Sequence, residues 1–198
     1  MKKYAISSNV RERIYTIIFI FSIFLSAGIT VLFNALVKDF AVDNFWVLLL
    51  NILILPTMGG INALLKWLFN NHIWKITSIS KFTKVPNLAG DWAIEGKNSN
   101  DFVYTGTLRI QQTFDKILVK GIFENSKSFN EETYFSFKED EVVLSYYYLN
   151  EPKQKGTNFN IHHGFAKIVF DSTINTAEGK YFNDDFRETK GIWKLKKK

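Results

Sequence analysis

Several residues in the second half of the chain carry side chains that are suited to holding a small ligand. Stacking of a base on an aromatic ring contributes about 1 to 3 kcal/mol, and an arginine guanidinium pairs with a phosphate through two parallel hydrogen bonds. The candidate ligand-binding residues are Tyr104, Thr133, Tyr146, Tyr148, His162, Tyr181, Arg187 and Thr189. Their chemistry predicts a pocket for a ligand with flat rings and negative charge, and a small nucleotide fits that description.

Each candidate also has a simpler structural interpretation. The tyrosines could fill a protein core with their hydroxyls reaching water, and a histidine is by default satisfied by a neighbouring group. Arg187 closely follows the turn residues Asp184 and Asp185, so a surface ion pair competes with phosphate binding. Both interpretations stay open from the sequence.

Catalytic and metal-binding motifs are absent from the sequence. It contains no cysteine and only three histidines, which excludes disulfides and thiolate zinc sites. It also has no glycine-rich phosphate loop, no nucleophile elbow and no histidine pair at helical metal spacing. The sequence therefore indicates a binding protein that is not an enzyme and that uses no cofactor or metal ion.

The elements that position the candidates follow Pro86, where apolar and polar residues begin to alternate with a period of two and turn signals recur. The expected strands are residues 90–97, 102–112, 116–124, 131–138, 141–148, 161–171, 177–182 and 187–195. Eight short sequential strands predict a small up-and-down antiparallel β-barrel. Such a barrel is just wide enough to be filled by side chains or to hold one small ligand.

The alternation also sorts the inward-facing residues by barrel end. An up-and-down chain reverses at every turn, so the candidate ligand-binding residues fall at one end, together with the longest expected loop, residues 149–160. The other end collects Trp92, Ile110, Ile117, Phe137, Val142, Phe170, Trp193 and Leu195. We therefore expect one polar, open end and one apolar, closed end.

The first part of the chain has a different character. Residues 1–84 hold nine Lys or Arg against three Asp or Glu and so carry the whole net charge of +6, whereas the rest holds sixteen of each sign. Residues 14–37 and 44–65 contain no charged side chain. As a helix, the first run would reach about 36 Å, enough to cross a hydrocarbon core of roughly 30 Å.

These runs predict a membrane protein of the all-β plus α class, with a two-span transmembrane hairpin and interfacial extension over residues 1–84 and a cytosolic barrel over residues 85–198. Basic residues flank the outer ends of the hairpin and its linker is acidic, so both termini of this multi-pass protein are expected in the cytoplasm. Helices of a soluble protein would show a polar stripe, whereas these runs carry no charge on any face. A barrel without net charge argues against bulk nucleic-acid binding.

Small and polar residues recur at every fourth position of the first span. They are Ser22, Ser26, Thr30 and Asn34. Such surfaces allow close contact between helices in a membrane. The contact could lie within one hairpin or between chains, and this pattern by itself favours the former.

The order of parts resembles the transmembrane β-barrel effectors of bacterial cyclic-oligonucleotide antiphage signalling (CBASS). The short motifs that carry the resemblance are LAGDW at residues 88–92, GKY at 179–181 and GIWKL at 191–195. Lipocalin-like and avidin-like barrels share similar glycine and tryptophan patterns, so the architecture carries more weight than the motifs.

The resemblance implies a receptor for a cyclic dinucleotide in the inner membrane of a bacterium. Ligand binding in the barrel would promote homo-oligomerisation, and the spans would then disrupt the phospholipid membrane and kill the infected cell. With that role, the stripe from Ser22 to Asn34 becomes a candidate oligomerisation surface. Two alternatives remain, a membrane-tethered carrier or sensor of an apolar small molecule and a structural scaffold with a solid barrel.

Overall fold

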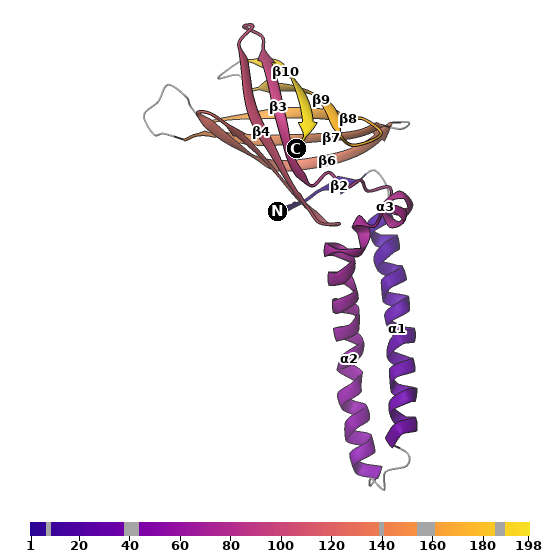
Figure 1. Ribbon diagram of the computed structural model, residues 1–198. Coiled ribbons are helices and arrows are strands. Elements are labelled where there is room, and N and C mark those ends of the chain that lie inside the picture. Colours follow the sequence, from indigo (N-terminus) through magenta and orange to yellow (C-terminus); the bar gives the residue numbers. More distant parts are fainter. Residues whose placement is uncertain (7–8, 38–43, 139–140, 154–160, 185–188) are drawn as a thin grey trace. The chain divides into compact units, whose positions relative to one another are not determined.

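The computed structural model describes the backbone of residues 1–6, 9–37, 44–138, 141–153, 161–184 and 189–198. The chain divides into two compact units, one formed by residues 9–84 and one by residues 1–8 together with 85–198. The first unit is helical and the second is a closed antiparallel β-barrel (Figure 1). The predicted fold class is therefore confirmed.

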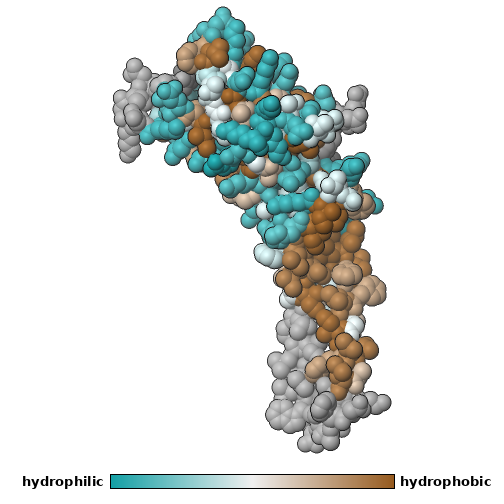
Figure 2. Space-filling view, in the orientation of Figure 1, coloured by the Kyte–Doolittle hydropathy of each residue, from teal (hydrophilic) through white to brown (hydrophobic). Residues whose placement is uncertain are grey.

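Two long helices make up most of the helical unit, α1 (Val10–Val37) and α2 (Asn44–Asn71). Among the described residues, one helix, Val10–Leu36, is long and apolar enough to cross a membrane, and only 6% of its most apolar stretch is buried. Phe24 is 71% exposed, and Figure 2 shows hydrophobic surface over the described part of the helices. The side chains of residues 44–57 lie outside the described part, so the second span stays a prediction.

The helices α1 and α2 pack against each other. Ser22 is fully buried in this contact, where Asn62 Nδ2 donates a hydrogen bond to Ser22 Oγ at 3.1 Å. Thr30 Oγ1 instead donates to the Ser26 carbonyl of its own helix at 3.0 Å, and Asn34 is exposed. Ser22 thus serves packing within the hairpin, and a role of these four residues between chains stays a prediction.

The second helix does not continue through the expected interfacial extension. It ends at Asn71 and is followed by the 3₁₀ turn η1 (Ile73–Lys75) and the short helix α3 (Thr77–Thr83). Trp74 in the turn is fully buried, whereas Phe82 on α3 is 65% exposed. Exposed aromatic residues among lysines remain typical of a segment at a membrane interface.

Eight strands form the wall of the barrel, as the sequence predicts. They are β3 (Gly90–Asn98), β4 (Val103–Gln112), β5 (Lys116–Phe123), β6 (Ser126–Lys138), β7 (Glu141–Pro152), β8 (His162–Phe170), β9 (Thr176–Asn183) and β10 (Lys190–Lys197). The largest difference in bounds is at β6, which begins five residues before the predicted start at residue 131. A bulge between Asn130 and Glu132 changes the phase of the alternation there and hides the first part of the strand.

The sheet closes on itself by two seams. Strand β10 pairs with β3 over an unbroken stretch from Gly191 to Lys197. The second seam joins only residues 120–122 of β5 to residues 127–129 of β6. Beyond these positions the two strands are not paired with each other.

The beginning of the chain occupies the gap that β5 and β6 leave. Strand β1 (Lys2–Lys3) pairs antiparallel with β5, and β2 (Ala5–Ile6) pairs parallel with β6. Between them Tyr4 is only 2% exposed, its hydroxyl donates to the Phe114 carbonyl, and its ring meets the edge of the Phe135 ring at 4.8 Å. The predicted division at residue 84 assigned these residues to the hairpin, because strands of two residues show no periodicity.

A buried amide supports the same gap from inside the barrel. Asn130 Oδ1 accepts a hydrogen bond from the Val119 N–H at 2.9 Å, and Asn130 Nδ2 donates to Thr133 Oγ1 at 2.8 Å. The bulge carries the β6 backbone away from β5, so this side chain replaces the missing strand partner of Val119. The second seam is thus completed by a side chain and by the N-terminal strands.

The end of the barrel predicted to be closed is a solid apolar core. The residues from that prediction that are at most 3% exposed are Trp92, Ile110, Ile117, Phe170 and Leu195. The Trp92 ring meets the Phe170 ring edge-on, with 5.0 Å between ring centroids. Val142 is only half-buried, and the side chain of Phe137 lies outside the described residues.

Candidate ligand-binding site

A cavity of about 480 Å³ lies at the other end of the barrel. Its lining comes from both strands of four successive hairpins, β3–β4, β5–β6, β7–β8 and β9–β10. The up-and-down topology brings these hairpins to one end, as the sequence predicts. We call this cavity the chamber.

Five of the eight candidate ligand-binding residues line the chamber. They are Tyr104, Tyr148, His162, Tyr181 and Thr189. Thr133 and Tyr146 face the interior but do not line the chamber, and they are 3% and 1% exposed. Arg187 lies outside the described residues. The structure therefore brings five candidates together, and their contact with a ligand stays a prediction.

Aromatic rings form one side of the chamber. The Tyr181 and Trp193 rings are stacked, with 4.9 Å between their centroids and 21° between their planes. Trp193 Nε1 donates a hydrogen bond to the Tyr104 hydroxyl at 2.7 Å, and the Tyr104 ring meets the Phe123 ring edge-on at 5.8 Å. Rings fixed in this way offer preformed faces for stacking with a flat ligand.

Trp193 was expected in the closed end, and this expectation is wrong. The predicted strand ended at residue 195, whereas β10 continues to Lys197. The extension places Trp193 in the middle of the strand, from where its ring reaches Tyr104 in the chamber. Phe123 also lines the chamber, and it is not among the candidate residues because its side chain has no polar group.

Two tyrosine hydroxyls inside the barrel, those of Tyr104 and Tyr146, have a raised pKa and therefore stay neutral. Burial raises the pKa of Tyr104, and its hydrogen bond with Tyr181 raises it further, against a smaller opposite effect of Trp193. Burial likewise raises the pKa of Tyr146. Among the described residues, no group accepts or donates a hydrogen bond to the Tyr146 hydroxyl. Each of these neutral hydroxyls can therefore donate a hydrogen bond.

Amides and hydroxyls line another part of the chamber. Tyr148 donates a hydrogen bond to Asn183 Oδ1 at 2.7 Å, and Asn183 Nδ2 donates to Thr189 Oγ1 at 2.5 Å. Asn150 and His162, which face each other on β7 and β8, are 7% and 5% exposed. This chain of groups provides both donors and acceptors, which is what the edge of a nucleobase requires.

Formal charge is scarce in the described lining. Glu124 is the charged residue among the described chamber residues, which include no Lys or Arg. Asn183 and Thr189 both line the chamber, and the unplaced Arg187 lies between them in the sequence. The described lining can thus contact the flat rings and polar edges of a ligand. Arg187, the predicted partner of a phosphate, lies outside the described residues.

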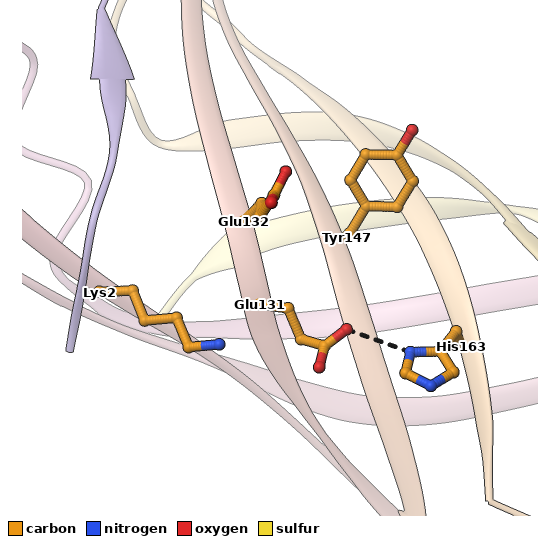
Figure 3. A pocket seen from close by; sticks show the side chains of 5 residues that line it. All are labelled: Lys2, Glu131, Glu132, Tyr147 and His163. Carbon is orange, nitrogen blue, oxygen red and sulfur yellow. Dashed lines mark hydrogen bonds and ion pairs between the residues drawn. The ribbon is translucent and has the colours of Figure 1, made fainter.

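A second cavity, of about 500 Å³, lies on the outer face beside the N-terminal strand (Figure 3). Glu131, the residue that bulges from β6, points toward His163, with 3.1 Å between Oε2 and Nδ1, and Lys2 extends toward it from the other side. Lys2 and His163 are exposed, and Glu131 is half-buried. Among the described residues, no group of three or more His, Asp or Glu could hold a metal ion.

Comparison with known proteins gives two matches. A family profile described as "Cap15, cyclic dinucleotide receptor domain" matches residues 83–197, the whole wall of the barrel. The chain is also similar to CD-NTase-associated protein 15 of Yersinia aleksiciae, with 33% identity over 142 residues that cover 69% of this chain and 67% of that protein. Both matches name a receptor or an associated protein, and neither names an enzyme.

Proposed function

The chain belongs to the Cap15 family of CBASS effectors, which carry a cyclic dinucleotide receptor domain, and from this premise we propose that the chamber binds a cyclic dinucleotide. Binding promotes assembly of several chains, and the assembled helices disrupt the inner membrane and kill the infected cell. The protein acts in this way without catalysis.

The observation that carries the proposal is the aromatic platform beside a row of polar groups. The stacked Tyr181 and Trp193 rings present a face on which a base gains about 1 to 3 kcal/mol. Asn183 and its neighbours supply the hydrogen bonds that orient the edge of a base. A volume of about 480 Å³ lies within the range of roughly 300 to 1,000 Å³ that is usual for small-molecule sites.

The strand pairing of the first residues supports a multi-pass topology with both termini on one side of the membrane, and the basic flanks of the helices favour the cytoplasmic side. Residues 2–6 and the strands that follow α2 form one barrel, so they lie on the same side of any membrane. If α1 crosses the bilayer, the chain has to cross again before β3. Helix α2, with 28 residues, is about 42 Å long and can make the return crossing.

Activation follows as a shift between populations of monomer and assembly. The ligand has to bind the assembled state more tightly than the monomer, because equal affinity for both would move no equilibrium. Cross-linking of the full chain in vesicles, with and without saturating cyclic dinucleotide, tests this step. Larger species only with ligand are expected, and the same distribution in both samples would exclude ligand-driven assembly.

Ligand binding itself is tested by titrating a panel of cyclic dinucleotides into the full chain in nanodiscs. Tyr181→Ala removes one side of the platform and should weaken binding by about tenfold or more. Tyr147→Ala is the matched control, because Tyr147 is a tyrosine of β7 that is 48% exposed on the outer face. Equal affinity of both variants would remove the chamber from the proposal.

Two further arms separate the ligand classes. Arg187→Ala should weaken binding by about 1.5 to 3 kcal/mol if the guanidinium holds a phosphate, and added salt should weaken the binding of the unaltered chain. The alternative function, a carrier of an apolar molecule, predicts instead that fatty-acid probes bind without salt dependence. Binding of the lipid probes alone would replace the proposed function.

A further inference from the structure

Five aromatic rings that line the chamber, all on strands, lie opposite a glycine on the neighbouring strand. The paired residues are Tyr104 and Gly96, Phe123 and Gly106, Tyr148 and Gly164, Tyr181 and Gly191, and Trp193 and Gly179. All five are direct cross-strand partners on the inner face, where side chains meet most closely. The arrangement recurs around the barrel and is not a feature of one hairpin.

Four of these rings, all except that of Trp193, lie so close to the opposite glycine that a methyl group would not fit beneath them. A Cβ atom at Gly96 would lie 2.4 Å from Tyr104 Cζ, and one at Gly164 would lie 2.5 Å from Tyr148 Cζ. The corresponding distances are 2.6 Å from Gly106 to the Phe123 ring and 2.6 Å from Gly191 to the Tyr181 ring. Carbon atoms in contact are normally about 3.5 to 4.0 Å apart, so these rings rest directly on the backbone of the next strand.

The closed end of the same barrel is paired in the opposite way. Trp92 faces Leu108, Leu144 faces Ile168, and none of these four side chains has measurable exposure. Large residues on both neighbouring strands lie side by side and fill the interior at this end. Where one partner of each pair is a glycine, the ring lies against the wall and the middle of the barrel stays open.

We propose that the four glycines where a Cβ would clash with the opposite ring, Gly96, Gly106, Gly164 and Gly191, determine the width of the chamber and act as positioning residues for ligand binding. They act through the rings: a larger residue would lift its ring off the wall and into the space that the ligand needs. The geometric part stands on strand register and contact distances alone. The part that concerns the ligand rests on the proposed function.

Gly96 offers the cleanest test of this proposal. A Cβ at Gly96 would have two Tyr104 ring atoms at 2.4 and 2.6 Å and the Tyr104 hydroxyl at 2.8 Å as its three nearest neighbours. By contrast, a Cβ at Gly191 would also lie 2.5 Å from the Lys97 carbonyl oxygen and would strain the backbone. Gly179→Ala is the matched control, because its Cβ would lie 3.1 Å from Trp193 and needs only a small adjustment.

The first readout needs no ligand. Trp193 Nε1 donates to the Tyr104 hydroxyl at 2.7 Å, so displacement of the Tyr104 ring changes the environment of that indole N–H. The five tryptophans of the full chain in nanodiscs give five indole N–H resonances, and Trp193→Phe identifies the relevant one. Gly96→Ala should shift this resonance, and an unmoved resonance would overturn the proposal.

The second readout is affinity for the cyclic dinucleotide that the unaltered chain binds best. Gly96→Ala should weaken binding by about tenfold or more, equivalent to the loss of one stacking contact, and Gly179→Ala should weaken it less. The same Gly96→Ala change in a Tyr104→Leu background should have little further effect, because the ring through which it acts is gone. Thermal unfolding of each variant without ligand shows whether it folds.

The outcomes separate this proposal from the proposed function. An equal loss of affinity in both backgrounds would mean that the glycine supports the barrel in general, and it would overturn the positioning role. Unchanged affinity despite a shifted resonance would overturn it as well. If the unaltered chain binds no cyclic dinucleotide, the proposed function fails, and the indole resonance alone decides whether Gly96 holds the ring against the wall.

Discussion

The two seams of the barrel solve the same problem with different means. Between β10 and β3 the sheet closes by a continuous ladder of backbone hydrogen bonds from Gly191 to Lys197. Between β5 and β6 the ladder covers residues 120–122 only, and Asn130 together with β1 and β2 completes the wall. The comparison teaches that closure of a small barrel does not require eight regular strands, provided that other groups satisfy the exposed strand edges.

The largest loss of stability is expected from a change at Tyr4, the buried side chain between the N-terminal strands at the second seam. Tyr4→Ala removes a buried ring and its hydrogen bond to the Phe114 carbonyl, so it should lower the free energy of unfolding by about 3 to 5 kcal/mol. Denaturant unfolding of the full chain in detergent micelles measures the loss. The control is Tyr134→Ala, a change at a tyrosine that is 44% exposed on β6. Equal losses would show that the N-terminal strands contribute nothing specific.

A smaller effect is expected from the amide that bridges the same seam. Asn130→Ala leaves the buried Val119 N–H without its acceptor, which should cost about 1 to 3 kcal/mol in the same measurement. Gln111→Ala serves as the comparison, because Gln111 is an exposed amide on β4. A stability loss no larger than that of the control would mean that water reaches Val119 and that the seam is already open.

The seams should also differ in how often they open. Within residues 120–122, the backbone amides that point toward β6 should exchange with solvent about tenfold faster than the amides of residues 192–196 that point toward β3, equivalent to about 1.4 kcal/mol in local opening. Hydrogen exchange of the full chain followed by mass spectrometry or NMR resolves the two groups. Tyr4→Ala should widen the difference, and equal protection at both seams would contradict the contrast between them.

The smallest loss of stability at neutral pH is expected at the regular seam. There, the hydrogen bond from Trp193 to Tyr104 joins β10 to β4, the two strands that flank β3. Tyr104→Phe should cost about 0.5 to 1.5 kcal/mol at pH 7. Burial raises the pKa of Tyr104, so above pH 10 the unfolded chain loses this proton before the folded chain does, and stability falls. Unfolding from pH 8 to pH 12 should show a weaker alkaline loss for Tyr104→Phe, and an identical pH profile would contradict this assignment.

The regular features of the molecule could be predicted from its sequence because they repeat. Apolar and polar residues alternate in eight segments, so an error in one segment does not change the predicted fold. Because the chain reverses at each turn, the order of the strands then determines which residues lie at the same end of the barrel. That reasoning brought Tyr104, Tyr148 and Tyr181 to one chamber without any knowledge of the strand register. The length of α1 likewise follows from a long run without charged residues.

The features that could not be predicted are those that leave no repeating pattern in the sequence. Tyr4 lies between two strands of two residues, too short for any periodic pattern. Asn130 precedes a bulge that reverses which side chains face inward. Trp193 was assigned to the wrong end because the assignment counted from the end of a strand, and the ends of strands are the least certain part of such a prediction. The pairing of rings with glycines was visible in the sequence only once the register was known.

The N-terminal strand also sets an order of events during synthesis. Tyr4 and Phe114 are 110 residues apart, and both long helices are made between them. In a chain that inserts these helices as proposed, the earliest residues have to remain extended and unpaired in the cytoplasm until most of the barrel has left the ribosome. We therefore expect the helices to insert into the membrane before the barrel closes, because the second seam needs both the first residues and strands made after the helices.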